Sequence, residues 1–467
     1  MLLHGDPTQL LPAREQMAFT LGFHIIIVPF GVAFTFMMLV ANYRALRRGD
    51  ADALLLARRW SKVSAVLFAV GAVSGTVLSF ELGLLWPGLM GRFGAAYGLP
   101  FAVEGIFFFL EAIFVAIYIY GWDRMRPWPH FWSGVPVPLA GLGGTASVVA
   151  ANAWMNRPGG VTLDHGRVVD VRPLEVYFNG AFWYEALHMF LAAYVVAGFV
   201  VGGVYARAML QGRTDSYHRL GFLIGFTTAA VVIPVQIYVG DVAAREVFHH
   251  EPAKFAAIEM TTTTSTHAPE VLGGALVDGK VRYGVSIPDG ASLLSGFSPS
   301  TRIRGLDAIP AAVRPADRIV TTVHLAFDVM VGTGFALLAL AAWYGYLRIR
   351  RRELPTSRRF LRCASVAGVV SVISLESGWV VTEVGRQPWT VVGLLQTDQA
   401  VTRSGQVWVF FTATLLVYLA VGTVTVVVLR AMSRRWRGSG GGDADDVPYG
   451  PSAAPAGPSC AGPDESA

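Results

Sequence analysis

Nine long apolar segments constrain the fold of this chain more than any other feature of its sequence. Each has the length that a helix needs to cross the hydrocarbon of a membrane, about 20 mostly apolar residues, and a helix bonds its own backbone groups there. The segments are 19–43, 63–85, 101–120, 135–154, 182–205, 220–239, 320–347, 366–384 and 407–429. The sequence therefore predicts an all-α polytopic membrane protein with about nine transmembrane helices.

Composition excludes an ordinary soluble enzyme. Of the 467 residues, 53% are hydrophobic and 15% are charged, whereas soluble proteins carry about 25% charged residues. The net charge of +5 does not indicate a nucleic-acid partner, because the basic residues lie mainly beside the apolar segments. Two cysteines, Cys363 and Cys460, are too few for a four-cysteine metal site or a CxxCH haem attachment. Any redox centre must be held without cysteine.

The arginines predict the orientation of the chain in the membrane. Basic loops follow the first, third, fifth, seventh and ninth segments, at 44–62, 124–126, 207–219, 348–362 and 430–437. With nine spans these loops share one side, so the positive-inside rule places the N-terminus outside and the C-terminus in the cytoplasm. The first segment is longer than a signal-peptide core and lacks a basic leader, so we expect it to remain as the first span.

Two regions are not expected to span the membrane. A polar loop of about residues 240–316 follows the sixth segment and is predicted to lie outside. Residues 438–467 are rich in Gly, Pro, Ala and Ser and cannot bury a core, so a disordered cytoplasmic tail is predicted there. Residues 1–437 form the transmembrane unit together with the outer loop.

Ionisable side chains within the apolar segments are the first candidates for function, because hydrocarbon tolerates them only when they are paired or ligated. Most of them fall at a similar depth near the predicted outer side, which favours one shared buried site. They are His24, Glu81, Glu104, Glu111, Glu185, His188, His324, Asp328, Glu376 and Glu383.

Glu104 and Glu111 are seven residues apart in EGIFFFLE. On a helix they share one face, about 10 Å apart along the axis. Such a ladder suits a proton relay; the alternative is two acids that hydrogen-bond neighbouring helices.

His24, His188 and Met330 are candidate ligands. Neither histidine has a second histidine three or four residues away, which argues against a zinc or di-iron box. One histidine per helix suits an axial haem ligand. The alternative for each histidine is a structural role, in which its ring packs between helices and is hydrogen-bonded. His188 and Met330 fall at comparable depth, which favours a His–Met pair, and His324 is the rival ligand nearer the outer edge.

Glu383 and Arg386 lie in ESGWVVTEVGRQPW at the end of the eighth segment. They form either an ion pair at the membrane edge or, in a haem site, a carboxylate ligand for iron and an arginine for a propionate.

Several motifs carry a resemblance to a known family, in the order and at the spacing that the family has. They are AREQMAFTLGFH, GTVLSFELGLLW, PFAVEGIFFFLEAIF, YGWDR, ANAWM, EALH, PAKFAAIE, FDVMVG and ESGWVVTEVGRQPW. Over about residues 14–437 the sequence resembles subunit I of cytochrome bd-type quinol oxidases. GTVLSFELGLLW and the short outer loop are similar to the cyanide-insensitive branch.

The resemblance implies a respiratory terminal oxidase of the bacterial cell membrane. It would oxidise quinol at the outer face and reduce O2 to water with cytoplasmic protons, which makes it electrogenic without a pump. The partner would be subunit II in a heterodimer, with a small accessory subunit in some members.

The resemblance also assigns roles to residues. It implies a low-spin haem b held by His188 and Met330, and a second haem pair, a haem b with either haem d or a third haem b. His24 and Glu383 would belong to that second pair, with Glu104 close by.

Glu104 and Glu111 would form part of the proton route. Lys254 and Glu259 in PAKFAAIE match the positions that contact quinol.

Two positions depart from the family pattern. Asp328 stands where the more familiar branch has arginine. Gly144 stands at a serine position, and Thr145 or Ser147 would replace that serine in a proton path.

A proton- or cation-coupled transporter is the alternative function, because intramembrane carboxylates also line ion paths.

Overall fold

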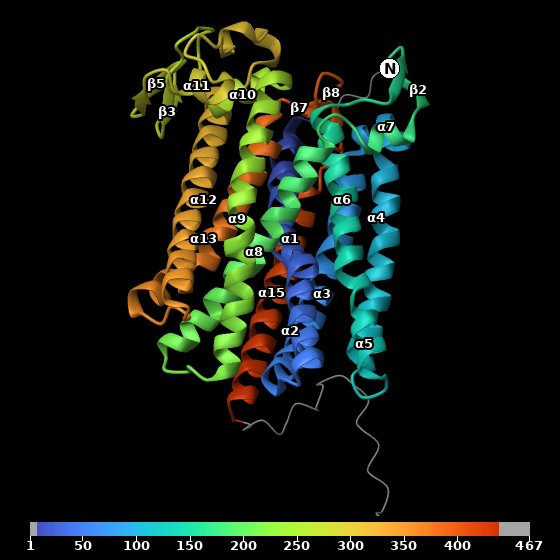
Figure 1. Cartoon of the computed structure of the whole chain (residues 1–467). Coiled ribbons are helices and arrows are strands. Elements are labelled where there is room, and N and C mark those ends of the chain that lie inside the picture. The colour runs from blue at the N-terminus through green and yellow to red at the C-terminus, as the bar shows by residue number, and fades with distance from the viewer. Residues whose placement is uncertain (1–6, 439–467) are drawn as a thin grey trace, which may run out of the picture.

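The computed structural model of the chain describes residues 7–438. Within that range, nine helices are long and apolar enough to cross a membrane, which confirms the predicted fold class. They pack into one elongated bundle with loops and short strands gathered at one end (Figure 1). The predicted tail at 438–467 lies outside the described residues, except for Gly438, the last residue of the final helix.

The first and fourth spans are built from more than one helical element, and the other seven are single helices. The first joins α1 (Leu10–Pro29), the π-helical η2 (Phe30–Phe34) and α2 (Thr35–Arg48), and the fourth joins α5 (Pro127–Gly134) and α6 (Pro136–Asn156). The others are α3 (Ala51–Leu85), α4 (Pro87–Gly121), α8 (Phe182–Leu210), α9 (Ser216–His250), α12 (Asp317–Arg351), α13 (Arg358–Gly385) and α15 (Val407–Gly438).

Most spanning helices extend beyond the apolar segments that predicted them. A helix of 35 residues, such as α9, is about 52 Å long, whereas the hydrocarbon is about 30 Å thick. Polar residues continue the helix where the membrane has ended. The outer loop consequently begins at Glu251, about ten residues later than expected from the sequence.

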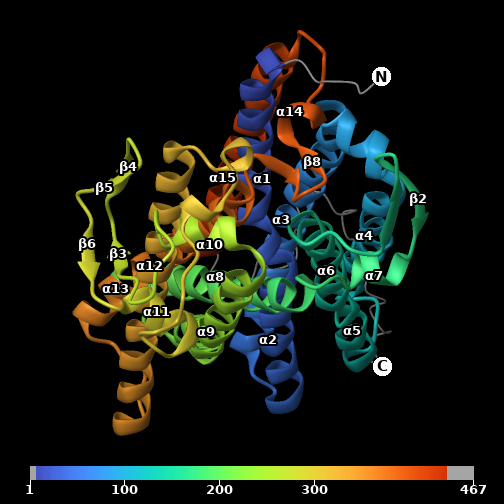
Figure 2. The same ribbon diagram turned by 90° about the horizontal axis from the view of Figure 1, so that it is seen from above.

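The short elements between spans lie mostly at one end of the bundle, which we call the loop end because it carries residues 251–316 (Figures 1 and 2). This loop contains α10 (Pro252–Ile258), α11 (Gly290–Gly296) and two antiparallel strand pairs. The pairs are β3 (Glu270–Leu272) with β6 (Val285–Ile287), and β4 (Ala275–Val277) with β5 (Lys280–Arg282).

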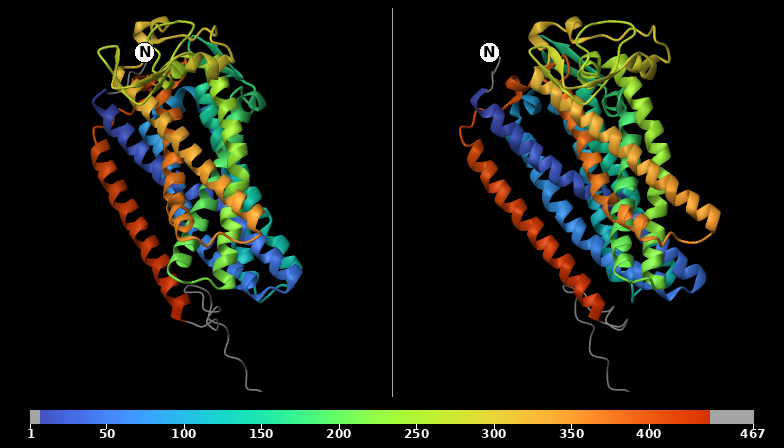
Figure 3. Two further views of the ribbon diagram at one scale, coloured as in Figure 1. Left: turned by 60° about the vertical axis from the view of Figure 1, so that its left-hand side comes forward. Right: turned by 90° about the vertical axis from the view of Figure 1, so that its left-hand side faces the viewer.

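Two other connections complete the loop end. The hairpin β1 (Val161–Asp164) and β2 (Arg167–Val171) leads into α7 (Pro173–Tyr177), and β7 (Trp389–Val391), β8 (Leu395–Gln396) and α14 (Thr397–Ala400) precede α15. The helix α15 packs along α1 and α3 at the side of the bundle (Figure 3). Short 3-10 turns occur at Pro7–Gln9, Leu306–Ala308 and Ala311–Val313.

The outer loop is attached to α12 through His324 and Asp328. His324 is 1% exposed, and its two ring nitrogens lie 2.6 Å from the Ile258 carbonyl oxygen and 3.0 Å from that of Gly273. The Asp328 carboxylate accepts a hydrogen bond from the Gly273 N–H at 2.6 Å. Buried backbone groups of the loop therefore find partners on a membrane helix.

A small-residue seam joins α8 to α9. Both helices carry a GxxxG pattern, GFVVG from Gly198 to Gly202 and GFLIG from Gly221 to Gly225, which lets membrane helices approach closely. A Cβ atom on Gly225 would lie 2.8 Å from the backbone nitrogen of Gly202. This approach fixes α8, which carries Glu185 and His188, against α9.

We expect a Gly225→Leu substitution to lower the thermal stability of the purified protein, because overpacking a close helix contact costs about 1–3 kcal/mol. The matched control is Gly345→Leu on α12, where an added Cβ atom meets nothing within 4 Å. Equal melting temperatures for the two variants would contradict a tight α8–α9 seam.

Candidate functional site

Two cavities inside the bundle, of about 690 and 430 Å³, have the size of ordinary ligand pockets. The first cavity lies among α1, α3, α4, α6 and α13, and the second among α8, α9, α10, α12 and α13. Val149, Asn152, Met189 and Trp379 line both, so the cavities share a wall.

The first cavity brings together five of the residues singled out from the sequence. Four of them come from α1, α4 and α13 and the fifth directly follows α13; they are His24, Glu104, Glu111, Glu383 and Arg386. The π-helical turn of the first span adds Gly31, where a Cβ atom would lie 3.1 Å from Glu111 Oε1. Local π-helical turns are frequent at functional sites.

The hydrogen bonds of His24 leave one ring nitrogen available in the first cavity. Nδ1 lies 2.9 Å from Ser74 Oγ, and that hydroxyl donates to the Val70 carbonyl oxygen at 2.9 Å. Because Ser74 uses its proton on Val70, His24 Nδ1 is the donor in their contact, and Nε2 keeps a free lone pair. A hydrogen bond of this kind orients a metal-ligating histidine.

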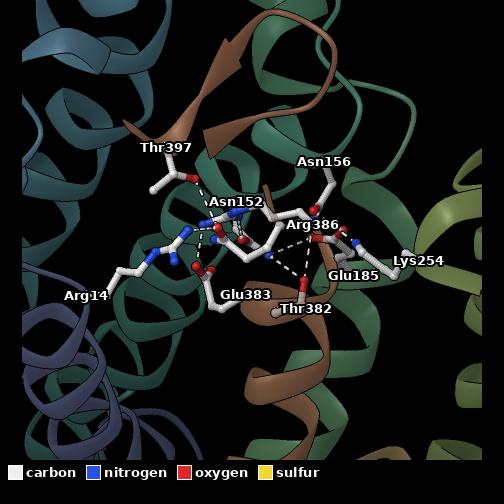
Figure 4. Close-up of polar contacts among 10 residues, drawn as sticks. Arg14, Asn152, Asn156, Glu185, Lys254, Thr382, Glu383, Arg386 and Thr397 are labelled. Atoms are coloured by element: carbon white, nitrogen blue, oxygen red, sulfur yellow. Dashed lines mark hydrogen bonds and ion pairs between the residues drawn. The ribbon is translucent and has the colours of Figure 1, made fainter. Parts of the chain in front are cut away.

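Two arginines give the first cavity positive charge at the loop end. Arg386 is 9% exposed, and it pairs with Glu383 and donates to Asn152 Oδ1 at 2.9 Å. Arg14 donates to Gln387 (Figure 4). The Nε atoms of both arginines are buried without a hydrogen-bond partner. Such orphaned donors fit an anionic group, for example a carboxylate of a bound ligand.

The second cavity brings together His188, Met330, Lys254 and Glu259. His188 Nδ1 is buried with no hydrogen-bond partner, and Nε2 lies 3.3 Å from Gln236 Nε2. Glycines let both candidate ligands pack closely against neighbouring helices, since a Cβ atom on Gly240 would lie 3.1 Å from His188 Cε1 and one on Gly378 would lie 3.0 Å from Met330 Sδ. A histidine and a methionine therefore line one cavity, and the histidine has a ring nitrogen without a hydrogen-bond partner.

Lys254 is a buried cation, 5% exposed, at the loop-end side of the second cavity. Its ammonium group pairs with Glu251 and donates to Asn156 Oδ1 at 3.0 Å. An ammonium group has three protons, so one remains for a ligand. A Cβ atom on Gly385 would lie 2.9 Å from Lys254 Cγ, so this glycine lets the lysine stem pass the end of α13.

Glu259 faces a second carboxyl group, that of Glu270. Both line the second cavity, and one oxygen of each, Oε2, is buried without a hydrogen-bond partner. Burial, the contact with Glu270 and the charge of Asp328 together raise the pKa of Glu259 well above its ordinary value. A proton shared between the two carboxyl groups would satisfy both.

Several residues considered in the sequence lie elsewhere. His324 does not line the second cavity, since its ring holds the outer loop. Glu376 lies beside α1, where a Cβ atom on Gly22 would be 3.3 Å from its Oε2, and it lines neither cavity. Of the two serine substitutes, Thr145 lines the first cavity and Ser147 does not.

Sequence reasoning gave no role to Asn152 and Asn156, which connect the two cavities. They lie four residues apart in the last turns of α6, and both donate to Glu185. The free-energy cost of burial in the membrane identifies ionisable residues first, but an asparagine amide also needs hydrogen-bond partners there. Two asparagines on one helix face were the signal that could have identified them.

Known proteins of one family resemble this chain over almost its full length. A family model described as cytochrome bd terminal oxidase subunit I matches residues 12–436. A relative from Bacillus subtilis (strain 168), provisionally named a cytochrome bd menaquinol oxidase subunit I, is 33% identical over 433 residues, covering 90% of this chain and 95% of the relative.

A second Bacillus subtilis relative, named cytochrome bd ubiquinol oxidase subunit 1, is 28% identical over 405 residues, covering 85% of this chain and 86% of the relative. The solved structure of bd oxidase from Geobacillus thermodenitrificans superposes with a TM-score of 0.86 at 33% identity, covering 93% of this chain and 100% of that chain.

These matches favour the oxidase over the coupled transporter that intramembrane carboxylates alone left open. The family accounts for two cavities lined by histidine, methionine and carboxylate side chains, because its members carry haem. The chain belongs to the cytochrome bd terminal oxidase subunit I family, whose members are multi-pass membrane proteins of the respiratory chain and parts of terminal quinol oxidases.

Proposed function

We propose that this chain is the haem-bearing subunit that oxidises quinol on the outer side of the membrane and reduces O2 to water with cytoplasmic protons. One observation carries the proposal: the candidate ligands divide between two cavities that share a wall, with a lysine and two carboxyl groups beside one and a carboxylate ladder beside the other. Quinol oxidation and oxygen reduction need separate sites that are close together.

His188 and Met330 would hold a low-spin haem b in the second cavity. His24 and Glu383 would serve a pair in the first cavity, a haem b with either haem d or a third haem b, and Arg14 and Arg386 would pair with propionates. Haem supplies one-electron transfer and the place where O2 is reduced. The free lone pair of His24, the unpartnered Nδ1 of His188 and the orphaned arginine donors support this assignment.

Lys254 and Glu259 would bind the quinol head group. The remaining proton of the Lys254 ammonium group is available to a quinol oxygen, and the Glu259 carboxylate accepts the proton that quinol loses on oxidation. Glu270 stands beside Glu259 at the base of the outer loop. Protons released there would leave on the outer side.

Glu111 and Glu104 would deliver protons to the first cavity from the cytoplasmic side. Both line that cavity, and the basic connections between helices lie at the end of the bundle opposite the loop end (Figure 1). The positive-inside rule then puts the loop end outside. Protons would be consumed from one side and released on the other, which separates charge without a pump.

Subunit II would pair with this chain in a heterodimer, with a small accessory subunit in some family members. Part of α4 is available for such contacts or for lipid, since Ile106 and Phe109 are 61% and 67% exposed. The expected location is the bacterial cell membrane, with the N-terminus outside.

A His188→Ala substitution tests the haem assignment. We expect the dithionite-reduced minus oxidised spectrum of the purified oxidase to lose the low-spin haem b bands and keep those of the other haems. The matched control is His324→Ala, whose ring contacts loop carbonyl groups and not the cavity, and which should keep all bands. Unchanged bands in His188→Ala would contradict the assignment.

A Glu104→Gln substitution tests the proton route. Loss of a positioned proton-transfer group lowers a rate by about 100-fold or more, so O2 consumption should fall by that factor. The His188-dependent spectrum should stay intact. Turnover close to the unsubstituted rate, measured with an oxygen electrode, would remove Glu104 from the route.

A Glu270→Gln substitution tests the role of Glu259 through pH. Glu270 raises the pKa of Glu259, so its neutralisation lowers that pKa and makes the accepting carboxylate available at lower pH. The acid limb of the profile of kcat/KM for quinol against pH should therefore move to lower pH. The control is Asp307→Asn, an exposed carboxylate of the same loop that does not line the cavity. A shift to higher pH would contradict the role.

A further inference from the structure

One carboxylate, that of Glu185, accepts hydrogen bonds from two asparagines of α6. Asn152 Nδ2 donates to Glu185 Oε2 at 3.1 Å, and Asn156 Nδ2 donates to Glu185 Oε1 at 3.0 Å. The two asparagines are four residues apart and share one helix face. Glu185 lies in the first turn of α8, where the helix dipole favours negative charge. Figure 4 shows these side chains converging on one another.

The second proton of each amide goes to Thr382. Asn152 Nδ2 and Asn156 Nδ2 lie 3.3 and 3.2 Å from Thr382 Oγ1. Each amide nitrogen therefore donates one proton to Glu185 and the other to Thr382. The two carbonyl oxygens consequently point away from Glu185. Because an ionised carboxylate only accepts hydrogen bonds, the ionised form of Glu185 holds both amides in this orientation.

Each carbonyl oxygen accepts a hydrogen bond from a buried cation. Arg386 donates to Asn152 Oδ1 at 2.9 Å, and Lys254 donates to Asn156 Oδ1 at 3.0 Å. Arg386 lines the first cavity and Lys254 lines the second. A buried cation is stable only where its donors find partners, so the positions of both cations depend on the two amides.

We propose that Glu185 is a positioning residue for both cavities at once. Through Asn156 it aims the Lys254 ammonium group at the quinol, and through Asn152 it aims the Arg386 guanidinium group at the anionic group of the first cavity. This role rests on the proposed function of the two cavities. It predicts that a substitution of Glu185, which hydrogen-bonds neither cation, alters the site whose asparagine amide reverses.

Glu185→Gln provides the first test. A glutamine side chain offers one acceptor and one donor group, so one asparagine must reverse its amide and withdraw its carbonyl oxygen from a cation. With the purified oxidase we expect the KM for a water-soluble quinol to rise about tenfold, as for loss of a hydrogen bond to a charged group. If the Asn152 amide reverses, the midpoint potential of a haem in the first cavity should shift instead.

Variants that change one asparagine at a time separate the effect on quinol binding from the effect on the first-cavity potential. Asn156→Ala should raise the KM for quinol and leave the first-cavity potential unchanged, and Asn152→Ala should do the reverse. Thr382→Val is the matched control, because it removes an acceptor shared by both amides while Glu185 still sets their orientation. It should change both readouts by less than twofold.

The double substitution Glu185→Gln with Asn156→Asp keeps the number of charges and restores the hydrogen-bond partners of both cations, and only the donation from residue 156 to Thr382 is lost. The new aspartate accepts from the amide of the new glutamine and from Lys254, and the glutamine oxygen accepts from Asn152, which again faces Arg386. This variant should recover both the KM and the potential, including the case in which Glu185→Gln alone does not assemble haem. Failure to recover either readout would overturn the positioning role.

The spectrum keeps this test distinct from that of the proposed function. If the His188-dependent haem bands are present and neither the KM nor the potential responds to Glu185→Gln, the positioning role alone is wrong. If those bands do not depend on His188, the assignment of the second cavity itself is wrong.

Discussion

Hydrocarbon tolerates polar side chains only where other groups satisfy them, and this constraint determines where the functional residues of this chain lie. The ionisable and amide side chains of α6, α8 and α13 meet one another between helices near the loop end. Their partners come from segments as far apart in sequence as Asn152 and Arg386. The polar network thus fixes how these helices assemble, and it places charges beside two cavities.

Close helix contacts and open cavities complement each other in this bundle. Glycines on α8 and α9 bring those helices together, while glycines beside His188 and Met330 let these side chains lie close to the neighbouring helices. The shared wall of Met189, Trp379 and Asn152 keeps the two cavities apart by roughly one layer of side chains. A short separation would suit the electron transfer between sites that the proposed function requires.

The sequence predicts the nine spans, because apolar length acts on each helix separately, and it identifies the ligand candidates by the cost of buried charge. Depth alone favoured one shared site, whereas His24, Glu104 and Glu383 line the first cavity and His188 lines the second. The helix ends could not be predicted, because α9 continues as far as His250 beyond the apolar segment. Polar residues outside the hydrocarbon carry no periodic signal of where a helix stops.

The hydrogen-bond network could not be predicted from the sequence either. The orientation of an asparagine amide depends on neighbours from three other helices, and no spacing along α6 reveals that Glu185 and Thr382 face it. His324 illustrates the same limit: depth made it a rival haem ligand, whereas its ring nitrogens contact carbonyl oxygens of the outer loop. Residue type and depth define candidates, and tertiary contacts decide among them.

The most direct measurement is an experimental structure of the purified oxidase at a resolution that places iron. The proposed function predicts a haem in the second cavity with its iron bound by His188 and Met330. It also predicts further haems in the first cavity, beside His24 and Glu383. A second cavity filled by lipid, or a haem bound there through other residues, would contradict it.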